Sequence, residues 1–356
     1  MSVVLEARSI RVEFQPRRAG AGVLRAVRDV DLVVREGETL ALVGESGSGK
    51  SSLARGILGL IPLAGGAVTL DGADLGRLRG RGLRRARRAA QMVFQDPYSS
   101  LDPMLTVGQS IAEPLEVNGT APRREFREIV GRLLEAVGLS PVLQDRYPHE
   151  FSGGQRQRVA IARAIAIRPK LLICDEAVSA LDVSTQNQIV GLLKRLQHEL
   201  GMACLFITHD LALVRHIARS VGVMYLGQIV EQGSVEAIYA DAAHPYTRAL
   251  MSAVPVADPV LQRRRSRTPL SGEIPDPVSP PSGCSFHPRC PRMLDMCRTV
   301  LPPMRPIRGT LAACHNPHEP SAKPVSAGPA PARPRRAPYP QASHDRVVGQ
   351  GEVDVV

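Results

Sequence analysis

The segment Gly44-Glu45-Ser46-Gly47-Ser48-Gly49-Lys50-Ser51 carries its residue types in the order that phosphate chemistry requires. Glycines let backbone N–H groups curl around phosphate oxygens, a lysine meets the outer phosphates, and a serine hydroxyl ligates Mg²⁺. The segment therefore predicts a nucleotide-binding loop. The residues expected at the nucleotide are Gly44, Ser46, Gly47, Gly49, Lys50, Ser51 and Ser52.

Two acidic residues, Asp175 and Glu176, follow an apolar run that begins at Lys170. A strand that ends in acids places them at the carboxyl edge of a sheet, beside the phosphate loop of a doubly wound fold. We expect Asp175 to hold Mg²⁺ together with Ser51, and Glu176 to polarise the attacking water. An isolated Asp-Glu pair more often ends a strand in a solvated turn. The phosphate loop upstream favours the catalytic interpretation here.

The elements around these residues must bring them to one edge of a sheet. Residues 39–43 predict a strand before the loop and residues 52–60 a helix after it, so that the helix N-terminus faces the anion. Strand-like runs and turns continue to about residue 90. Helical spacing dominates from about 91 to 160, with Gly138 ending one helix, and strands and helices then alternate to about 240. This order predicts an α/β fold with a largely parallel sheet covered by helices.

The string Ser152-Gly153-Gly154-Gln155, after Phe151, completes a set of motifs that resembles the ATP-binding cassette (ABC) family. The family signature more often has Leu where Phe151 stands. The resemblance implies that this helix N-terminus closes over the γ-phosphate of ATP held by the opposite subunit, so that two ATPase domains build each site. It also implies that Asp182, at the end of Ser179-Ala180-Leu181-Asp182, crosses the same interface. Ala177 replaces a Pro that is common in the family and should be tolerated there.

The same resemblance assigns roles to Gln95, His209 and Phe14. Gln95 would reach Mg²⁺ and sense a transmembrane partner, and His209 would contact the γ-phosphate. A histidine at a strand end is otherwise more often solvated or structural. Family members often stack an aromatic ring on adenine, and Phe14 is the only aromatic residue before Gly44. A place in the core of a strand is an equally supported interpretation of Phe14.

Cysteines divide into two groups. Cys174 and Cys204 lie in apolar runs and are expected to behave as small core residues. Four more cluster near the C-terminus, with five, six and sixteen residues between neighbours: Cys284, Cys290, Cys297 and Cys314. In a cytosolic protein such a cluster more often binds a metal than forms disulfides. Paired Cys-x₂-Cys knuckles are absent from these spacings, which favours an iron–sulfur cluster, with zinc second and unligated thiols third.

Several strings narrow the resemblance to the ATPases of oligopeptide/dipeptide and nickel importers, over roughly residues 3–318. They are residues 94–103, 178–184, 244–247, 272–277 and 281–291. In that family the four-cysteine element is similar to one that carries a [4Fe–4S] cluster, and the four cysteines match it position by position. The implied fold is an α/β, ABC-type P-loop ATPase with a mixed sheet core, a helical subdomain and a small Cys-rich C-terminal extension.

The expected organisation has three parts. Residues 1–255 form the ABC ATPase domain, with the helical subdomain at approximately 91–160. Residues 256–320 form the C-terminal extension with the four cysteines. Residues 321–356 are rich in Pro, Ala and Arg and predict a disordered tail.

The function implied by the resemblance is ATP hydrolysis that powers import of di- or oligopeptides across the cytoplasmic membrane. Its cofactors would be ATP with Mg²⁺ and a [4Fe–4S] cluster, or Zn²⁺ in its place. Its partners would be two transmembrane permeases, a second ABC ATPase subunit of different sequence rather than a copy, and an extracytoplasmic substrate-binding protein. The chain would lie peripherally on the cytoplasmic face of the membrane. Import of nickel or another small solute, a soluble ABC ATPase of nucleic-acid metabolism, and a non-hydrolysing cassette are the alternatives.

Composition constrains these alternatives. The chain has 356 residues, 44% of them hydrophobic, with no apolar run near the roughly 20 residues that span a bilayer. Charged residues interrupt the first segment, so no signal peptide is expected there. Its net charge of +11 is concentrated in Arg77–Arg88, Arg263–Arg267 and Arg333–Arg336. Strongly basic chains often bind nucleic acid. The first cluster has no interleaved aromatic residues, however, and predicts a solvated helical face, so no nucleic-acid partner is expected.

Overall fold

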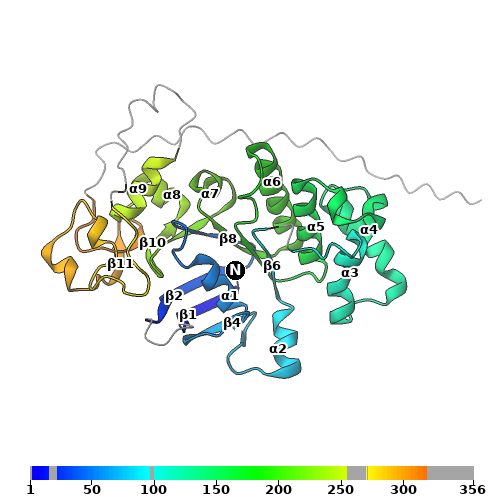
Figure 1. The fold of residues 1–356 in the computed structure, drawn as a ribbon, viewed down its shortest axis with the longest axis horizontal. Helices are drawn as coiled ribbons and strands as arrows, with labels where there is room; N and C mark the ends of the chain where they lie inside the picture. Colours follow the sequence, from blue (N-terminus) through cyan, green and yellow to red (C-terminus); the bar gives the residue numbers. More distant parts are fainter. Residues whose placement is uncertain (1, 16–21, 97–99, 255–269, 271, 319–356) are drawn as a thin grey trace, which may run out of the picture. The chain divides into compact units, whose positions relative to one another are not determined.

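The computed structural model describes residues 2–15, 22–96, 100–254, 270 and 272–318, which belong to one compact unit (Figure 1). The predicted disordered tail, the Arg263–Arg267 cluster and the arginines at 333–336 lie outside the described residues.

An eight-stranded mixed sheet forms the centre of this unit, in the order β11-β12-β10-β9-β3-β8-β7-β6. The five strands from β9 to β6 are parallel, and β10, β12 and β11 add antiparallel pairs at one edge. The predicted mixed α/β sheet is therefore confirmed. The strands are β3 Thr39–Val43, β6 Ala90–Val93, β7 Leu171–Asp175, β8 Ala203–Thr208, β9 Ser220–Tyr225, β10 Gln228–Ser234, β11 Met304–Ile307 and β12 Thr310–Ala313.

The three middle strands β3, β8 and β7 are buried at every residue. Their sequences are almost entirely apolar, as expected for parallel strands with both faces covered. Hydrophobic residues on one face join a core with the helices, and those on the other face join a core with a second sheet. The helices that follow the central strands are α6 Val183–Leu200, α7 Leu211–Ile217, α8 Val235–Asp241 and α9 Pro245–Ala253.

A separate four-stranded antiparallel sheet has the order β2-β1-β4-β5 and lies beside α1 (Lys50–Ile57) (Figure 1). Burial alternates along much of β2, so that one face packs and the other faces solvent. The sequence predicted strand-like runs here but did not assign them to a second sheet. Its strands are β1 Val3–Phe14, β2 Leu24–Arg35, β4 Gly65–Leu70 and β5 Ala73–Asp74.

The helical region differs from its predicted bounds of 91–160. Its first residues belong to strand β6, which pairs with β7, and its last helix continues to Ile165. The helices are α3 Val107–Asn118, α4 Phe126–Ala136 and α5 Gly153–Ile165, which lie together in Figure 1. A left-handed Gly138, at φ 75°, follows the end of α4 as the sequence predicted. Helix α2 (Gly80–Arg87) has no buried residue, which confirms the solvated arginine face.

The C-terminal extension continues the central sheet, because β12 pairs with β10. A buried carboxylate, that of Glu231 in β10, fixes this junction. It accepts hydrogen bonds from the backbone amides of Ala243 and His244, at 2.7 and 3.0 Å, and from the Thr310 hydroxyl at 2.9 Å. Among the described residues, none of the helices combines the length and apolar character that crossing a bilayer requires.

Candidate active site

The phosphate loop connects buried β3 directly to α1. Gly49 caps α1 in the left-handed region, at φ 102°, and a Cβ there would lie 2.1 Å from the Ala26 carbonyl oxygen. A Cβ on Gly44 would lie 2.2 Å from the Met224 carbonyl oxygen. Only glycine fits at these two positions. The helix begins at Lys50, two residues before the predicted start, because the left-handed Gly49 turns the chain straight into it.

Lys50 lies inside the loop and is only 3% exposed. Its ammonium donates to the carbonyl oxygens of Gly44 and Glu45, both at 2.9 Å, and lies 3.4 Å from the Ser48 hydroxyl. Burial lowers the pKa of Lys50, while the charges of nearby carboxylates act in the opposite direction. A cation held mainly by backbone carbonyls is well suited to exchange these partners for phosphate oxygens.

Asp175 ends β7 and meets the phosphate loop. Its Oδ1 accepts a hydrogen bond from the Ser51 hydroxyl at 2.7 Å. Burial raises the pKa of Asp175, and the Ser51 hydrogen bond opposes this shift. A hydroxyl and a carboxylate are hard oxygen donors that fit Mg²⁺. No set of three His, Cys, Asp or Glu side chains in the described ranges is placed around one ion, so a magnesium ion here would need phosphate or water oxygens as further ligands.

Glu176 contacts two side chains that are distant from it in the sequence. Its Oε2 accepts a hydrogen bond from Gln95 Nε2 at 3.2 Å and lies 3.4 Å from His209 Nδ1. The side chain of Glu176 is 15% exposed, whereas that of His209 is 57% exposed. The structure thus brings the expected base, Glu176, together with Gln95 and His209, to which the family resemblance assigned roles at Mg²⁺ and the γ-phosphate.

The backbone of Glu176 is left-handed, at φ 48°, which costs about 1–3 kcal/mol for a residue other than glycine. Three hydrogen bonds hold this conformation. Its amide donates to the Ile207 carbonyl at 3.0 Å, and its carbonyl accepts from the amide and hydroxyl of Ser179, at 3.0 and 2.9 Å. The turn directs the Glu176 side chain toward Gln95 and His209. Nothing in the sequence indicated this conformation.

Ser152 begins α5 at a second helix N-terminus. Its hydroxyl accepts from the Gln155 amide at 3.3 Å, and the Gln155 side chain accepts from the Ser152 amide at 3.0 Å. The next helix, α6, begins at Asp182, whose carboxylate accepts from the amide and hydroxyl of Thr185; these bonds lower the pKa of Asp182. Within the described part of the chain, no hydrogen bond or ion pair joins residues 152–155 to the phosphate loop.

Comparison with protein families gives two matches. Residues 27–179 match the ABC transporter family, and residues 230–297 match the oligopeptide/dipeptide transporter C-terminal region. The probable peptide ABC transporter ATP-binding protein y4tS of Sinorhizobium fredii is 55% identical over 294 residues, covering 82% of this chain and 83% of that protein. The oligopeptide transport ATP-binding protein OppF of Salmonella typhimurium is 48% identical over 307 residues, or 84% and 92% of the two chains.

The chain belongs to the ABC transporter family. Among solved structures, cbiO1 of Clostridium perfringens, part of an ABC transporter complex, superposes with a TM-score of 0.59 at 30% identity, covering 67% of this chain and 92% of that one. A dimeric ATP-binding cassette, MJ0796 in a post-hydrolysis state with ADP and phosphate, gives the same TM-score at 29% identity, covering 65% and 98%. The ABC ATPase fold and the activity of a transport ATPase are therefore established for this chain.

In this ABC ATPase, Phe14 is the last residue of β1 and is 39% exposed. The interpretation of Phe14 as a core residue is therefore wrong, because the strand turns this side chain to solvent. Its stacking on adenine stays a prediction. Ser46 is exposed and Ser52 is half-buried in α1, and their contact with nucleotide likewise stays a prediction.

Two residues that the sequence analysis missed form hydrogen bonds with Glu45 of the phosphate loop. The Tyr246 hydroxyl accepts from the Glu45 amide at 2.9 Å, and Arg289 forms two hydrogen bonds with the Glu45 carboxylate. Both lie in strings that resemble the oligopeptide importer family. Neither string contains a signal that points to the phosphate loop, since the contacts depend on how the extension folds back.

The four C-terminal cysteines of the ABC ATPase are free thiols, and they lie near enough to one another to interact electrostatically. The Cys284 amide donates to the Cys297 carbonyl at 2.9 Å. Burial raises the pKa of Cys284 to about 11 and that of Cys314 to about 12, and the other thiols of the group shift both in the same direction. In the described residues, these thiols are not placed so that three or more of them could hold one metal ion together. Four neighbouring soft thiols are the donor type that iron–sulfur clusters and zinc use.

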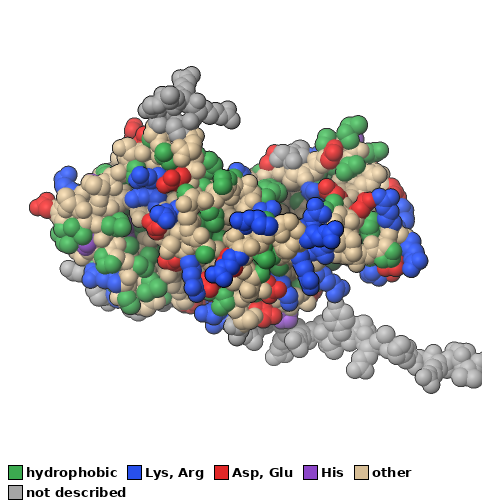
Figure 2. Space-filling model, turned by 90° about the horizontal axis from the view of Figure 1, so that it is seen from below, with side chains coloured by type: hydrophobic (Ala, Val, Ile, Leu, Met, Phe, Trp, Pro, Cys, Tyr) green, Lys and Arg blue, Asp and Glu red, His purple; other side chains and the backbone are tan. Residues whose placement is uncertain are grey.

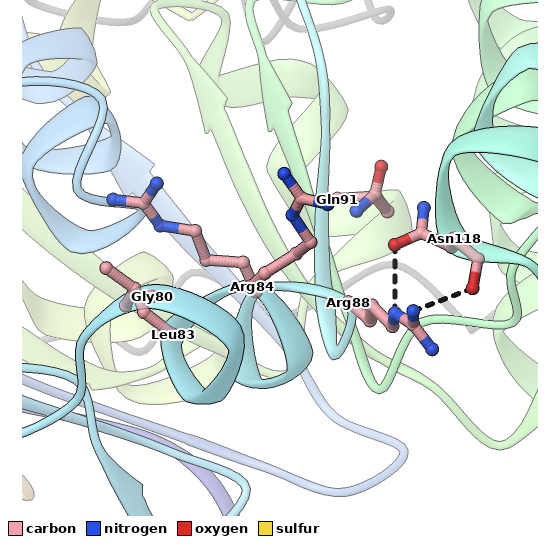
Figure 3. A pocket seen from close by; sticks show the side chains of 7 residues that line it. Gly80, Leu83, Arg84, Arg88, Gln91 and Asn118 are labelled. Atoms are coloured by element: carbon pink, nitrogen blue, oxygen red, sulfur yellow. Dashed lines mark hydrogen bonds between the residues drawn. The ribbon is translucent and has the colours of Figure 1, made fainter.

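A cavity of about 390 Å³ lies between α2 and the end of α3. Arg84 reaches toward it, and Arg88 donates to the side chain and carbonyl oxygens of Asn118, at 2.9 and 2.6 Å (Figure 3). Basic side chains are spread over the face seen in Figure 2, with acidic side chains between them. This mixture differs from the continuous basic surface, with stacking aromatics, that is typical of nucleic-acid binding.

Proposed function

We propose that this chain is the ATP-hydrolysing subunit of a peptide importer and drives transport from the cytoplasmic face of the membrane. The observation that carries the proposal is the meeting of Gln95, Glu176 and His209 at Glu176 Oε2, beside Lys50 and the Ser51–Asp175 pair. Peptide as the cargo is supported by the names of relatives such as y4tS and OppF and by the match to the oligopeptide/dipeptide transporter C-terminal region.

In the proposed reaction the loop amides and the Lys50 ammonium bind the phosphates of ATP. Ser51, Asp175 and Gln95 would hold Mg²⁺, and the ion would neutralise phosphate charge when bound. Glu176 orients a water molecule and accepts its proton as the water oxygen attacks the γ-phosphorus and the bond to ADP breaks. His209 donates to the γ-phosphate and, together with Gln95, holds the Glu176 carboxylate in position.

A second cassette completes each site. Ser152, Gly153, Gly154 and Gln155 of one subunit would close over the γ-phosphate bound to the other, and Asp182 would line the same interface. The similarity to the dimeric cassette with ADP and phosphate supports this arrangement. We propose a partner ATPase of different sequence, because peptide importers of this type commonly use two different ATPase subunits.

Two permeases and an extracytoplasmic binding protein would complete the transporter. The Gln95 segment is the proposed contact with the permeases, because residues that line two cavities come just before and just after it in the sequence. One is lined by Arg84, Arg88 and Gln91, and the other, of about 370 Å³, by Leu101 and Arg163 among others. A permease segment seated there could move the Gln95 side chain and hence Glu176.

The four-cysteine element is proposed to hold a [4Fe–4S] cluster on Cys284, Cys290, Cys297 and Cys314. A cluster of four irons spreads its thiolate ligands farther apart than one zinc ion, whose tetrahedral sulfurs lie about 2.3 Å from the metal. Anaerobically purified protein should therefore contain iron and sulfide and absorb visible light. Stoichiometric zinc without iron would establish the zinc alternative. Protein that contains neither iron nor zinc would show that the thiols are unligated.

The decisive test of function is reconstitution of the chain with its two permeases and second ATPase in vesicles. We expect ATP turnover to rise when a peptide-loaded binding protein is added, and labelled peptide to accumulate. Stimulation by nickel or another small solute, with none by peptides, would change the cargo. Stimulation by DNA or ribosomes in the absence of permeases would overturn the proposal in favour of nucleic-acid metabolism.

A further inference from the structure

The four-cysteine element reaches the phosphate loop through the residues between its first two cysteines. Phe286 is buried in an aromatic cluster, 5.3 Å from Tyr225 and 5.4 Å from Tyr246 between ring centroids. Phe286 anchors this segment on the ATPase domain, since aromatic contacts of this kind contribute area and fixed geometry. The next contact along the segment is made by Arg289, immediately before Cys290.

Arg289 makes a two-pronged ion pair with the phosphate loop. Its side chain is 4% exposed, and its two terminal nitrogens donate to the carboxylate oxygens of Glu45 at 2.7 and 3.1 Å. The guanidinium also lies 5.9 Å from the centre of the Tyr225 ring. A planar guanidinium in this arrangement fixes both the position and the orientation of its carboxylate.

Glu45, whose carboxylate is fixed by Arg289, also contacts Lys50. Its amide is held by the Tyr246 hydroxyl at 2.9 Å, and its carbonyl accepts from the Lys50 ammonium, also at 2.9 Å. Side chain, amide and carbonyl of one loop residue are therefore fixed by three different groups. A second contact of the same element, from Arg28 to Ser285 at 3.1 Å, involves a strand outside the loop and does not reach Lys50.

We infer that Arg289 is a positioning residue for ATP: through Glu45 it holds the phosphate loop in its nucleotide-binding shape, so that the four-cysteine element sets the nucleotide affinity of the cassette. The inference rests on the phosphate-loop assignment in the proposed function and deepens it. Loss of Arg289 leaves a partly buried carboxylate without its partner, which disfavours the present loop conformation. A distortion of the four-cysteine element would act on ATP along the same route.

The test compares full-length variants for binding of a nonhydrolysable ATP analogue with Mg²⁺, by calorimetry. We expect Arg289→Ala and Glu45→Ala each to weaken binding by about tenfold, and the double variant to weaken it no further, as for contacts of one network. Arg289→Lys should recover only part of the affinity because it lacks the fork. In the assembled transporter, Arg289→Ala should raise KM for ATP more than it lowers kcat.

Arg298→Ala is the matched control, because Arg298 lies in the same element, is exposed, and reaches no residue of the loop. Accessibility of the four thiols to a thiol reagent reports whether each variant keeps the element folded. If Arg289→Ala unfolds it, Glu45→Ala alone decides. Unchanged affinity in Glu45→Ala, or equal effects of Arg298→Ala and Arg289→Ala, would overturn the inference. Unchanged affinity in Lys50→Ala would instead overturn the phosphate-loop assignment itself.

Discussion

The two helix N-termini that the proposed mechanism assigns to ATP differ in their caps and in the side chains around them. The N-terminus of α1 is capped by glycine without a side-chain hydrogen bond, and buried Lys50 and Asp175 surround it. The N-terminus of α5 is closed by the reciprocal hydrogen bonds of Ser152 and Gln155. The first has free amides, a cation and acids for metal and water. The second has a hydroxyl, two glycines and the Gln155 side chain, followed by Arg156.

This difference explains why the proposed ATP site would require both helix N-termini. The α5 terminus is capped, and the nearby Arg156 donates to the carbonyl oxygens of Pro148 and His149. Such a terminus binds an anion weakly, since a helix end alone contributes about 0.3–1 kcal/mol near the surface. It is suited to recognise a phosphate that is already held elsewhere. In the proposed mechanism, the phosphate loop would therefore determine whether ATP binds, and the Ser152 end would determine whether two cassettes close around it. Variants at the two ends should separate these effects.

Glu176→Gln should have the largest effect. The amide cannot accept the proton of the attacking water, so turnover should fall by about 10²–10⁴-fold while ATP still binds. Single-turnover ATPase assays and size-exclusion chromatography with ATP should show retained nucleotide and an accumulated closed pair. Glu128→Gln is the control, because Glu128 is exposed on α4 and pairs with Arg132, away from the phosphate loop. Full steady-state activity of Glu176→Gln would show that another group is the base.

Lys50→Ala should act on binding. Hydrogen bonds to charged groups contribute about 1.5–3 kcal/mol, so affinity for the nonhydrolysable analogue should fall by about 10- to 150-fold. The control is Lys194→Ala, which removes an exposed lysine from α6. Equal affinity of wild type and Lys50→Ala would mean that the loop does not bind phosphate.

Much of the difference between the phosphate loop and the Ser152 end could be predicted from the sequence. The positions of Lys50, Ser51 and Asp175 could be predicted because local patterns determine them. These patterns are the glycines of the loop, the buried strand and the polarity of the helix. The meeting of Gln95 and His209 at Glu176 required the family resemblance, because they come from three separate segments. The left-handed Glu176 and the Arg289–Glu45 pair were not predictable: both depend on how distant segments pack, and no local pattern encodes that.

Ser152→Ala should have an intermediate effect, seen mainly in the assembled pair. Loss of an N-cap costs about 1 kcal/mol of stability, and loss of the hydroxyl at the neighbour's phosphate should lower turnover by about tenfold. Ser234→Ala is a matched control, since Ser234 caps α8 through the Ala237 amide at 3.1 Å. Both variants should lose similar stability. Equal turnover in the two would remove Ser152 from the composite site.

The last comparison concerns stability rather than turnover, namely how the N-terminus of α5 packs against α6. A Cβ on Gly154 would lie 2.6 Å from Thr185 Cγ2, and Thr185 cannot rotate away without breaking its hydroxyl bond to Asp182. Gly154→Ala should therefore cost about 1–3 kcal/mol by overpacking and lower the melting temperature by a few degrees. A Cβ on Gly153 would lie 3.5 Å from Leu181 Cδ2, an ordinary contact. Gly153→Ala should keep or slightly raise the melting temperature, because alanine favours the helix. A lower melting temperature for Gly153→Ala than for Gly154→Ala would mean that contact with α6 does not fix the Ser152 end.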